Sequence, residues 1–176
     1  MMNKCLKIAI LAVVPCLIAA QSTQAQNQEI LVSDKSVVCL AKNMYYESRN
    51  QGIAGQLAVS AVVLNRVNDH RFPDTICEVV EQGPTRASWK DPKIKFPIKH
   101  RCQFSWYCDG KSDNPKQTKI YEQFLDLSEA ILNNEFSFVD ITDGATFYHA
   151  DYVKPSWAKT KLKTIEIEDH IFYRWE

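Results

Sequence analysis

Hydrophobic residues recur at helical spacing in two neighbouring segments near the start of the chain. In residues 37–48 the apolar positions are three or four apart, which predicts an amphipathic helix with one buried face. Asp34 is a suitable N-cap for this helix. Residues 54–68 are apolar on almost every side, which predicts a buried central helix. Gly52 and Gly55 fall between the two patterns and are expected to end the first helix and turn the chain.

The remaining pattern predicts shorter elements and a change of period near the C-terminus. We expect a short helix over 75–81, a long loop over 83–101, an extended segment over 104–108 and a helix that starts at Asn114-Pro115 and ends near residue 134. Residues 145–149 are typical of a strand, and 163–167 with 170–175 of a hairpin. The predicted fold class is therefore α+β, with a helical core and a small antiparallel β-sheet near the C-terminus.

The N-terminus has the pattern of a secretory signal. Lys4 and Lys7 precede an apolar run over residues 8–20, and residues 23–25 offer a small-x-small cleavage site. We expect a signal peptide at 1–25, a short tether at 26–33 and one domain at 34–176, exported to the periplasm or secreted, with no stable membrane span once the signal is removed. A signal retained as an anchor is the alternative.

Four cysteines remain beyond the predicted signal, at Cys39, Cys77, Cys102 and Cys108. An even number of cysteines in an exported chain predicts two disulfides, and three pairings are open. A zinc site is the competing interpretation, but the spacing shows no CxxC pair.

Charge gives little indication of a polyanionic partner for the chain as a whole. Without the predicted signal the chain has 19 basic and 21 acidic residues, which argues against nucleic acid as the main partner. The basic residues are nevertheless concentrated in residues 86–101, where Asp91 is the one acidic residue. This segment is either a contact for an anionic polymer or a solvated loop.

Glu47 is the candidate of greatest chemical interest. It lies at the edge of the apolar face of the first predicted helix, close to the helix end. Burial on one side disfavours the ionised carboxylate and makes the carboxyl a better proton donor near neutral pH. The alternative is a solvated glutamate that pairs with Arg49 or Lys42.

Several blocks of sequence, in matching order, resemble the SleB/CwlJ-type cell-wall hydrolase family. They are residues 45–67 (YYESRNQGIAGQLAVSAVVLNRV), 71–75 (RFPDT), 103–106 (QFSW), 144–149 (GATFYH), Pro155-x-Trp157 and His170-x-Phe172-Tyr173. The resemblance runs from about residue 39 to residue 173. One departure is that the family usually has Glu-Ala-Arg-Gly where this chain has Glu47-Ser48-Arg49-Asn50.

The resemblance implies a lysozyme-like fold and a single-glutamate lytic transglycosylase that acts on peptidoglycan glycan strands. Glu47 occupies the family's catalytic position. It would cleave the bond between N-acetylmuramic acid and N-acetylglucosamine (MurNAc–GlcNAc) and leave a 1,6-anhydro-muramic end, because the muramic C6 hydroxyl serves as nucleophile. Such a reaction needs no cofactor and no metal, and we expect a monomer.

The supporting residues form a wider set of candidates. Gln103 and Ser105 offer polar groups for a sugar, Phe104 a ring, and Tyr148 and His149 a phenol and an imidazole that could contact a saccharide. Each has a structural alternative, a core strand for residues 103–106 and a satisfied structural histidine for His149.

Three further residues, in the first two helices and their junction, complete the expected substrate-binding set: Tyr46, Arg49 and Gln56.

Other classes of function stay open. A lysozyme-type muramidase would use a second carboxylate, but Asp143, Asp151 and Asp169 all lie where turns favour aspartate. A zinc-dependent amidase or peptidase would draw on His149, Asp151 and His170, which match no metal-ligand spacing. The last class is a wall-binding module without catalysis.

Overall fold

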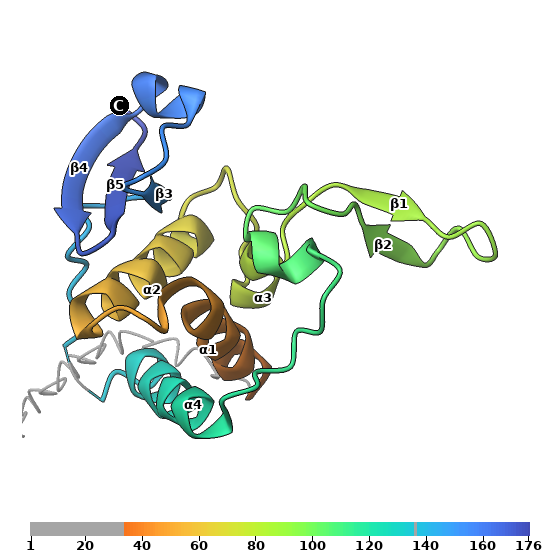
Figure 1. Cartoon of the computed structure of the whole chain (residues 1–176), viewed down its shortest axis with the longest axis horizontal. Coiled ribbons are helices and arrows are strands. Elements are labelled where there is room, and N and C mark those ends of the chain that lie inside the picture. The colour runs from red at the N-terminus through yellow and green to blue at the C-terminus, as the bar shows by residue number, and fades with distance from the viewer. Residues whose placement is uncertain (1–33, 136) are drawn as a thin grey trace, which may run out of the picture. The chain divides into compact units, whose positions relative to one another are not determined.

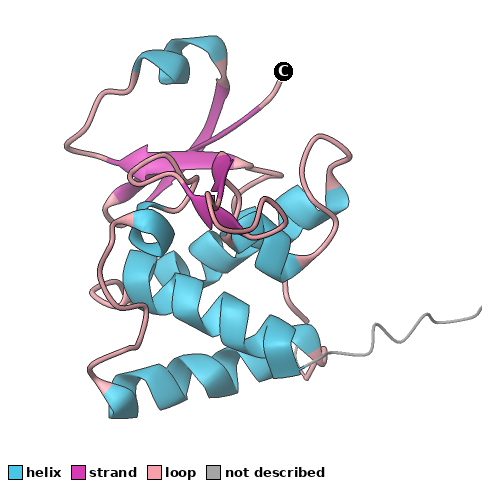
Figure 2. Ribbon diagram, turned by 90° about the vertical axis from the view of Figure 1, so that its right-hand side faces the viewer, coloured by secondary structure: helices cyan, strands magenta, loops and turns pink. Residues whose placement is uncertain are grey.

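The structure is a computed structural model, and it describes residues 34–135 and 137–176. The predicted signal and tether lie outside the described residues. Within the described part of the chain, helices and a small sheet form separate layers, as Figure 2 shows. No helix in this part is long and apolar enough to cross a membrane.

Four α-helices form the lower layer in Figure 2: α1 (Asp34–Ser48), α2 (Ile53–Asn68), α3 (Ile76–Val80) and α4 (Thr118–Leu132). The predicted helices in these positions are confirmed. Helix α1 packs against the other three helices, and Leu40, Ala41 and Met44 on its apolar face are fully buried. Helix α2 is apolar because it lies between α1 and the sheet, and Val63 faces one hydrophobic cluster while Val62 faces the other.

The C-terminal sheet has three antiparallel strands: β3 (Phe147–Ala150), β4 (Leu162–Ile167) and β5 (His170–Arg174). Their order is β3-β5-β4, so the predicted hairpin is confirmed and β5 is the central strand. Phe172 of β5 is fully buried against Ala58 and Val62 of α2. This contact holds the sheet over the helix that follows Glu47, and a 3₁₀ helix, η2 (Ser156–Thr160), connects β3 to β4.

Three local predictions were wrong. Residues 104–108 are not extended, because a disulfide between Cys102 and Cys108 closes this short segment into the 3₁₀ helix η1 (Ser105–Cys108). The long loop contains a hairpin of its own, β1 (Thr85–Ala87) and β2 (Lys95–Pro97). Helix α4 begins at Thr118 and not at Asn114, because the Gln117 N–H donates to the Tyr45 hydroxyl at 3.2 Å and holds the preceding residues as a loop on α1.

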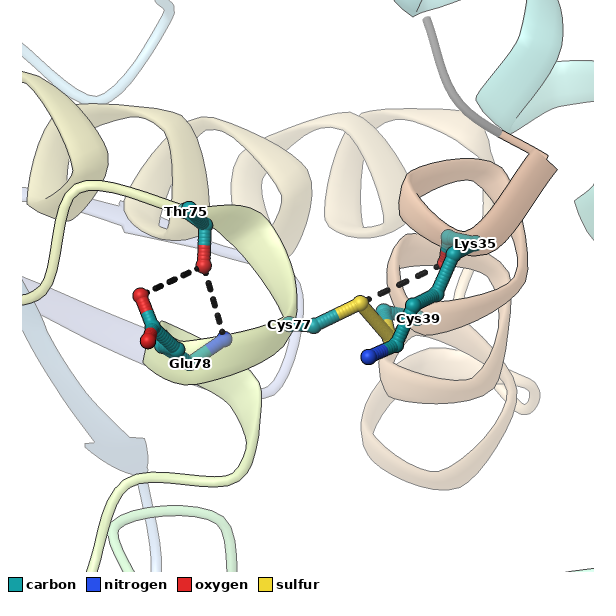
Figure 3. Close-up of a disulfide and its surroundings, with 5 residues drawn as sticks. All are labelled: Lys35, Cys39, Thr75, Cys77 and Glu78. Carbon is teal, nitrogen blue, oxygen red and sulfur yellow. Dashed lines mark hydrogen bonds between the residues drawn. A yellow bond between two sulfur atoms is a disulfide. The ribbon is translucent and has the colours of Figure 1, made fainter.

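The prediction of two disulfides is confirmed. Besides Cys102–Cys108, a bond between Cys39 and Cys77 links α1 to α3 (Figure 3). The start of α3 is fixed by Thr75, whose hydroxyl oxygen accepts from the Glu78 N–H at 3.3 Å and whose O–H donates to the Glu78 carboxylate at 2.7 Å. Thr75 is thus the N-cap of α3, and this start of the helix places Cys77 beside the first turns of α1.

Candidate active site

Glu47 lies at the C-terminal end of α1 and lines a cavity of about 480 Å³. The cavity is formed by α1, α2, the segment around η1, and β3 with the residues that follow it. Tyr148, on β3, donates a hydrogen bond from its hydroxyl to Glu47 Oε2 at 2.9 Å. The two residues are 101 positions apart in the chain, so the site exists only when the sheet is docked on the helices.

The environment of Glu47 favours its protonated form. Burial raises the pKa of Glu47 above its ordinary value of 4.5, while the hydrogen bond from Tyr148 and the charge of Arg66 act in the opposite direction. Burial and the nearby Glu47 carboxylate raise the pKa of Tyr148 well above its ordinary value. Tyr148 is therefore a neutral hydrogen-bond donor to Glu47 at neutral pH.

Arg66 is a buried cation beside this pair. Its side chain projects from α2, its Nε–H donates to the Thr146 carbonyl at 2.8 Å, and its guanidinium lies over the rings of Phe72 and Phe104 at 5.3 and 5.1 Å. Nη1 is buried and has no hydrogen-bond partner among the described residues. Burial lowers the pKa of Arg66 to about 10, so the side chain is still charged at neutral pH.

A second hollow of about 320 Å³ also contains Glu47. It shares Tyr46, Glu47, Ala150, Tyr152 and His170 with the first cavity and extends toward Arg49 and the residues that follow it. Glu47 thus lies where two hollows meet. A polymer bound in both hollows would have one of its internal units beside the Glu47 carboxyl group.

Most of the predicted site residues lie at these cavities, but their roles differ. Gln103 and Ser105 are exposed at the first cavity and are free to contact a ligand. Phe104 is buried and packs under Arg66, so its ring supports the site from below. Tyr46 stacks on Trp106 with ring centroids 4.7 Å apart, and it lines both hollows that contain Glu47.

His149 lines the first cavity with both of its ring nitrogens engaged. Nδ1 lies 2.8 Å from the Ala150 carbonyl, which makes it the protonated nitrogen, and Nε2 then accepts from the Tyr173 hydroxyl at 3.0 Å. Its ring also stacks on Tyr173. This arrangement fits the structural interpretation of His149, since neither nitrogen is left for a saccharide or a metal.

Arg49 is exposed and lines the second hollow, where its guanidinium lies 5.3 Å from the centre of the Tyr45 ring. Gln56 does not reach either hollow. Its amide donates to the Gln51 carbonyl at 3.0 Å and closes the turn between α1 and α2. The first turn of α2 directs Gln56 to the helix junction, and its part in substrate binding stays a prediction.

Two residues of the site lie outside the expected substrate-binding set. Arg66 is a charged residue in an otherwise apolar helix, and His170 was named only in a family block and as a candidate zinc ligand. His170 is 7% exposed, packs edge-on against Tyr148 at 5.0 Å and lines both hollows. Burial lowers the pKa of His170, so its imidazole is mainly neutral at pH 7, and its Nδ1 has no partner among the described residues.

Asp169 is the one carboxylate other than Glu47 that lines either of the two hollows in the described part of the chain. It accepts from the Gln51 amide at 2.8 Å and lies in the tight turn between β4 and β5. Across residues 34–135 and 137–176, no three His, Cys, Asp or Glu side chains are grouped so as to hold a metal ion.

Comparisons with known proteins agree with the resemblance seen in the sequence. The sequence model of the family described as Cell Wall Hydrolase matches residues 50–173. A spore cortex-lytic enzyme of Halalkalibacterium halodurans is 38% identical over 154 residues, 87% of this chain, and one of Bacillus subtilis is 35% identical over 60 residues, 34% of this chain. The chain spans 39% of the length of the first of these relatives and 20% of the second.

A solved structure shares the fold. The catalytic domain of the germination-specific lytic transglycosylase SleB from Bacillus anthracis is 27% identical, with a TM-score of 0.56 over 82% of this chain and 98% of that domain. This match confirms the predicted lysozyme-like α+β class. The residues that the family model matches make up more than half of the sequence, although they begin three positions after Glu47. The chain belongs to the cell wall hydrolase family.

Proposed function

We propose that the chain cleaves the MurNAc–GlcNAc bond of peptidoglycan as a lytic transglycosylase, with Glu47 as its one acid and base. The observation that carries this proposal is the position of Glu47. A carboxyl whose pKa is raised by burial is fixed by Tyr148 at the meeting point of two hollows, one of which contains no other carboxylate.

The first step uses protonated Glu47. Tyr148 holds Oε2, and Oε1 accepts no hydrogen bond from the described residues, so Oε1 is the oxygen that would carry the proton to the glycosidic oxygen. The bond between muramic C1 and that oxygen breaks, and the leaving sugar departs as an alcohol. Positive charge develops on the muramic ring while Glu47 becomes a carboxylate, which Tyr148 and the nearby Arg66 cation stabilise.

The second step returns the proton to Glu47. The carboxylate takes the proton of the muramic C6 hydroxyl, the oxygen bonds to C1, and a 1,6-anhydro end forms. The substrate supplies the nucleophile, so water is not consumed and no second carboxylate is required. Most hydrolytic glycosidases, by contrast, use a pair of carboxyl groups.

The second candidate is a hydrolytic muramidase, and Asp169 is the observation that favours it. Its carboxylate lines the same hollow as Glu47 and could hold a water molecule. Its bond to Gln51 and its place in a tight turn support a structural role instead. The product of the reaction separates the two candidates, because a hydrolysed end contains one more water than an anhydro end.

The test is digestion of purified peptidoglycan followed by mass spectrometry of the products. Wild-type protein should release anhydro-muropeptides at a rate that a chelator does not change. Glu47→Gln should lose ~10²–10⁴-fold in rate, the usual contribution of one general acid–base group. Asp169→Asn should still give anhydro products. Glu122→Gln, an exposed glutamate on α4, is the matched control and should behave as wild type.

Other results would point elsewhere. Reducing ends that disappear in Asp169→Asn would establish the muramidase. Chelator-sensitive release of peptides would establish a zinc amidase or peptidase. Binding to the wall without any released product would leave a wall-binding module. A Glu47→Gln variant within a few-fold of wild type would remove Glu47 from the reaction.

The cellular context belongs to the same proposal. We infer that the protein acts as a monomer in the periplasm or outside the cell, with peptidoglycan glycan strands as its partner and nucleic acid excluded by its charge. Two disulfides in the described residues support an oxidising compartment.

A further inference from the structure

The hairpin formed by β1, β2 and their connecting turn projects away from the helices, as Figure 1 shows at the right of the view. None of the residues from 85 to 97 lines either hollow that contains Glu47. The proposed cleavage of peptidoglycan therefore does not account for it. We call residues 85–101, the hairpin and its return to the body of the protein, the basic hairpin.

Three large apolar side chains of the basic hairpin are exposed to solvent. Trp89 is 87% exposed, Ile94 50% and Phe96 49%. Phe96 lies in β2, and Ile94, two positions earlier and just before the strand, is bonded to Ser88 and directed to the same face. Trp89 lies beyond β1, with Lys90 Nζ 5.1 Å from the centre of its ring. Three large exposed apolar side chains on one short projecting element are consistent with a surface that is buried in a complex.

The same segment concentrates positive charge. It holds six Lys and Arg residues against Asp91, whereas the rest of residues 34–176 has 13 basic and 19 acidic residues. All six cations are exposed, and none makes an ion pair with another residue of the described chain. They are Arg86, Lys90, Lys93, Lys95, Lys99 and Arg101. The positive charge is therefore directed outward, toward an anionic partner.

The hairpin presents these groups on a defined backbone. The strands pair in register with Arg86 opposite Phe96, and the ladder continues with a hydrogen bond from the Ser88 N–H to the Ile94 carbonyl at 2.7 Å. The turn is closed by bonds from the N–H groups of Ile94 and Lys93 to the carbonyl and carboxylate of Asp91, both at 3.0 Å. Such order lowers the entropic cost of docking.

We propose that the basic hairpin docks on the surface of an anionic phospholipid bilayer. Trp89, Ile94 and Phe96 would enter the boundary between headgroups and acyl chains, where tryptophan is favoured, and the lysines and arginines would contact the phosphates. An acidic polysaccharide would use the cations but has no apolar layer for Ile94 and Phe96. A second copy of the hairpin would bring like charges together. The bilayer is the partner that uses both features.

Vesicle flotation with the intact protein tests the proposal. Vesicles with one part phosphatidylglycerol to two of phosphatidylcholine should bind the protein, and phosphatidylcholine alone should bind it at least tenfold more weakly. Neutralising two cations, Lys93→Gln with Lys95→Gln, should weaken binding on the order of 25-fold, because each cation near an anionic surface contributes about fivefold. Trp89→Ser with Phe96→Ser should weaken binding by about tenfold or more.

Matched controls separate the hairpin from general charge and apolarity. Lys119→Gln with Lys159→Gln removes two exposed cations elsewhere, and Val139→Ser removes a side chain that is 68% exposed. Both should bind vesicles within about twofold of wild type. Thermal unfolding should show each variant folded, and tryptophan emission should shift to the blue on vesicle binding in wild type but not in Trp89→Phe.

Two results would overturn the proposal. One is absence of binding to the anionic vesicles at low salt. The other is binding that the loss of Trp89 and Phe96 leaves unchanged, especially if a soluble anionic polysaccharide binds equally well, which would make an acidic polymer the partner. Digestion of soluble glycan fragments by the hairpin variants should equal that of wild type, so the proposed enzymatic activity stands or falls separately.

Discussion

Replacing Glu47 by Gln should make the protein more stable at neutral pH, although it should remove activity. Burial raises the pKa of Glu47 above 4.5, so the folded protein holds this proton more tightly than the unfolded chain does. The free energy of unfolding therefore falls as pH rises from about 4.5 to the raised pKa. Glutamine has a similar shape and no charge, and it does not incur this loss.

The structure sets the size of the gain. A carboxylate can accept about four hydrogen bonds, and Glu47 accepts one, from Tyr148. A charged group that is left partly unsatisfied on burial costs about 1–3 kcal/mol. The buried Arg66 cation offsets part of this cost, since its charge lowers the pKa of Glu47. We expect a net gain of about 1 kcal/mol for Glu47→Gln at pH 7.5, which corresponds to a rise of roughly 2–4 °C in Tm.

Differential scanning calorimetry at pH 4, 5.5 and 7.5, under non-reducing conditions, measures the effect. The Tm difference between Glu47→Gln and wild type should be largest at pH 7.5 and close to zero at pH 4. Glu122→Gln, an exposed replacement on α4, should show no comparable trend. A variant that is less stable than wild type at pH 7.5, or a gain that does not change with pH, would refute the assignment of Glu47 as a desolvated carboxyl.

Three further changes have expected outcomes. Tyr148→Phe removes the hydrogen-bond donor that favours ionised Glu47. The alkaline limb of the kcat/KM–pH profile should therefore move to higher pH, and kcat at the optimum should fall by about tenfold. An alkaline limb that moves to lower pH contradicts this. Cys39→Ser with Cys77→Ser should lower the free energy of unfolding in urea by ~2–4 kcal/mol, and an unchanged midpoint would show that the bond between α1 and α3 adds nothing. Glu168→Ala should cost ~1–2 kcal/mol by the same measurement, because two backbone N–H groups lose their acceptor; equal stability would contradict the cap.

The helical core and the C-terminal hairpin could be predicted because each depends on local periodicity. Helix α2 was predicted to within one residue at its start, and the hairpin was centred correctly on its turn. The segment 104–108 could not be predicted, since its conformation depends on which cysteine pairs with Cys102. Sequence left three pairings open, and only the pairing with Cys108 forces a tight turn there.

The sequence pointed to Glu47 in the candidate site but to fewer of the residues that surround it. Helical spacing places Glu47 at the edge of a buried face, and the resemblance to the cell-wall hydrolase family singles it out as the candidate acid. Arg66 could not be assigned to the site, because a guanidinium in an apolar helix is stable only when groups distant in the sequence contact it. Those groups are the rings of Phe72 and Phe104 and the carbonyl of Thr146, which meet Arg66 only in the folded chain.

The junction of α1 and α2 explains why the sheet lies where Tyr148 and His170 can reach Glu47. The Glu168 carboxylate, in the hairpin turn, accepts from the N–H groups of Gly52 and Gly55 at 2.7 and 3.3 Å and so caps the start of α2. A Cβ at Gly52 or Gly55 would lie 2.8 Å from this carboxylate, so a larger side chain at either position would displace it.

The contact between the Glu168 carboxylate and the N–H groups of Gly52 and Gly55 also positions the hairpin turn of the sheet. Gln51 strengthens it through a bond from its amide to Asp169 at 2.8 Å, and His170 follows directly in the chain. Glu47 lies four residues before Gln51 on the other side of the same junction. These turn contacts therefore position both the end of α1, which carries Glu47, and the start of β5, which carries His170. The glycines are needed here for close approach to a carboxylate and not to end α1, since α1 ends at Ser48 and Gly55 lies within α2.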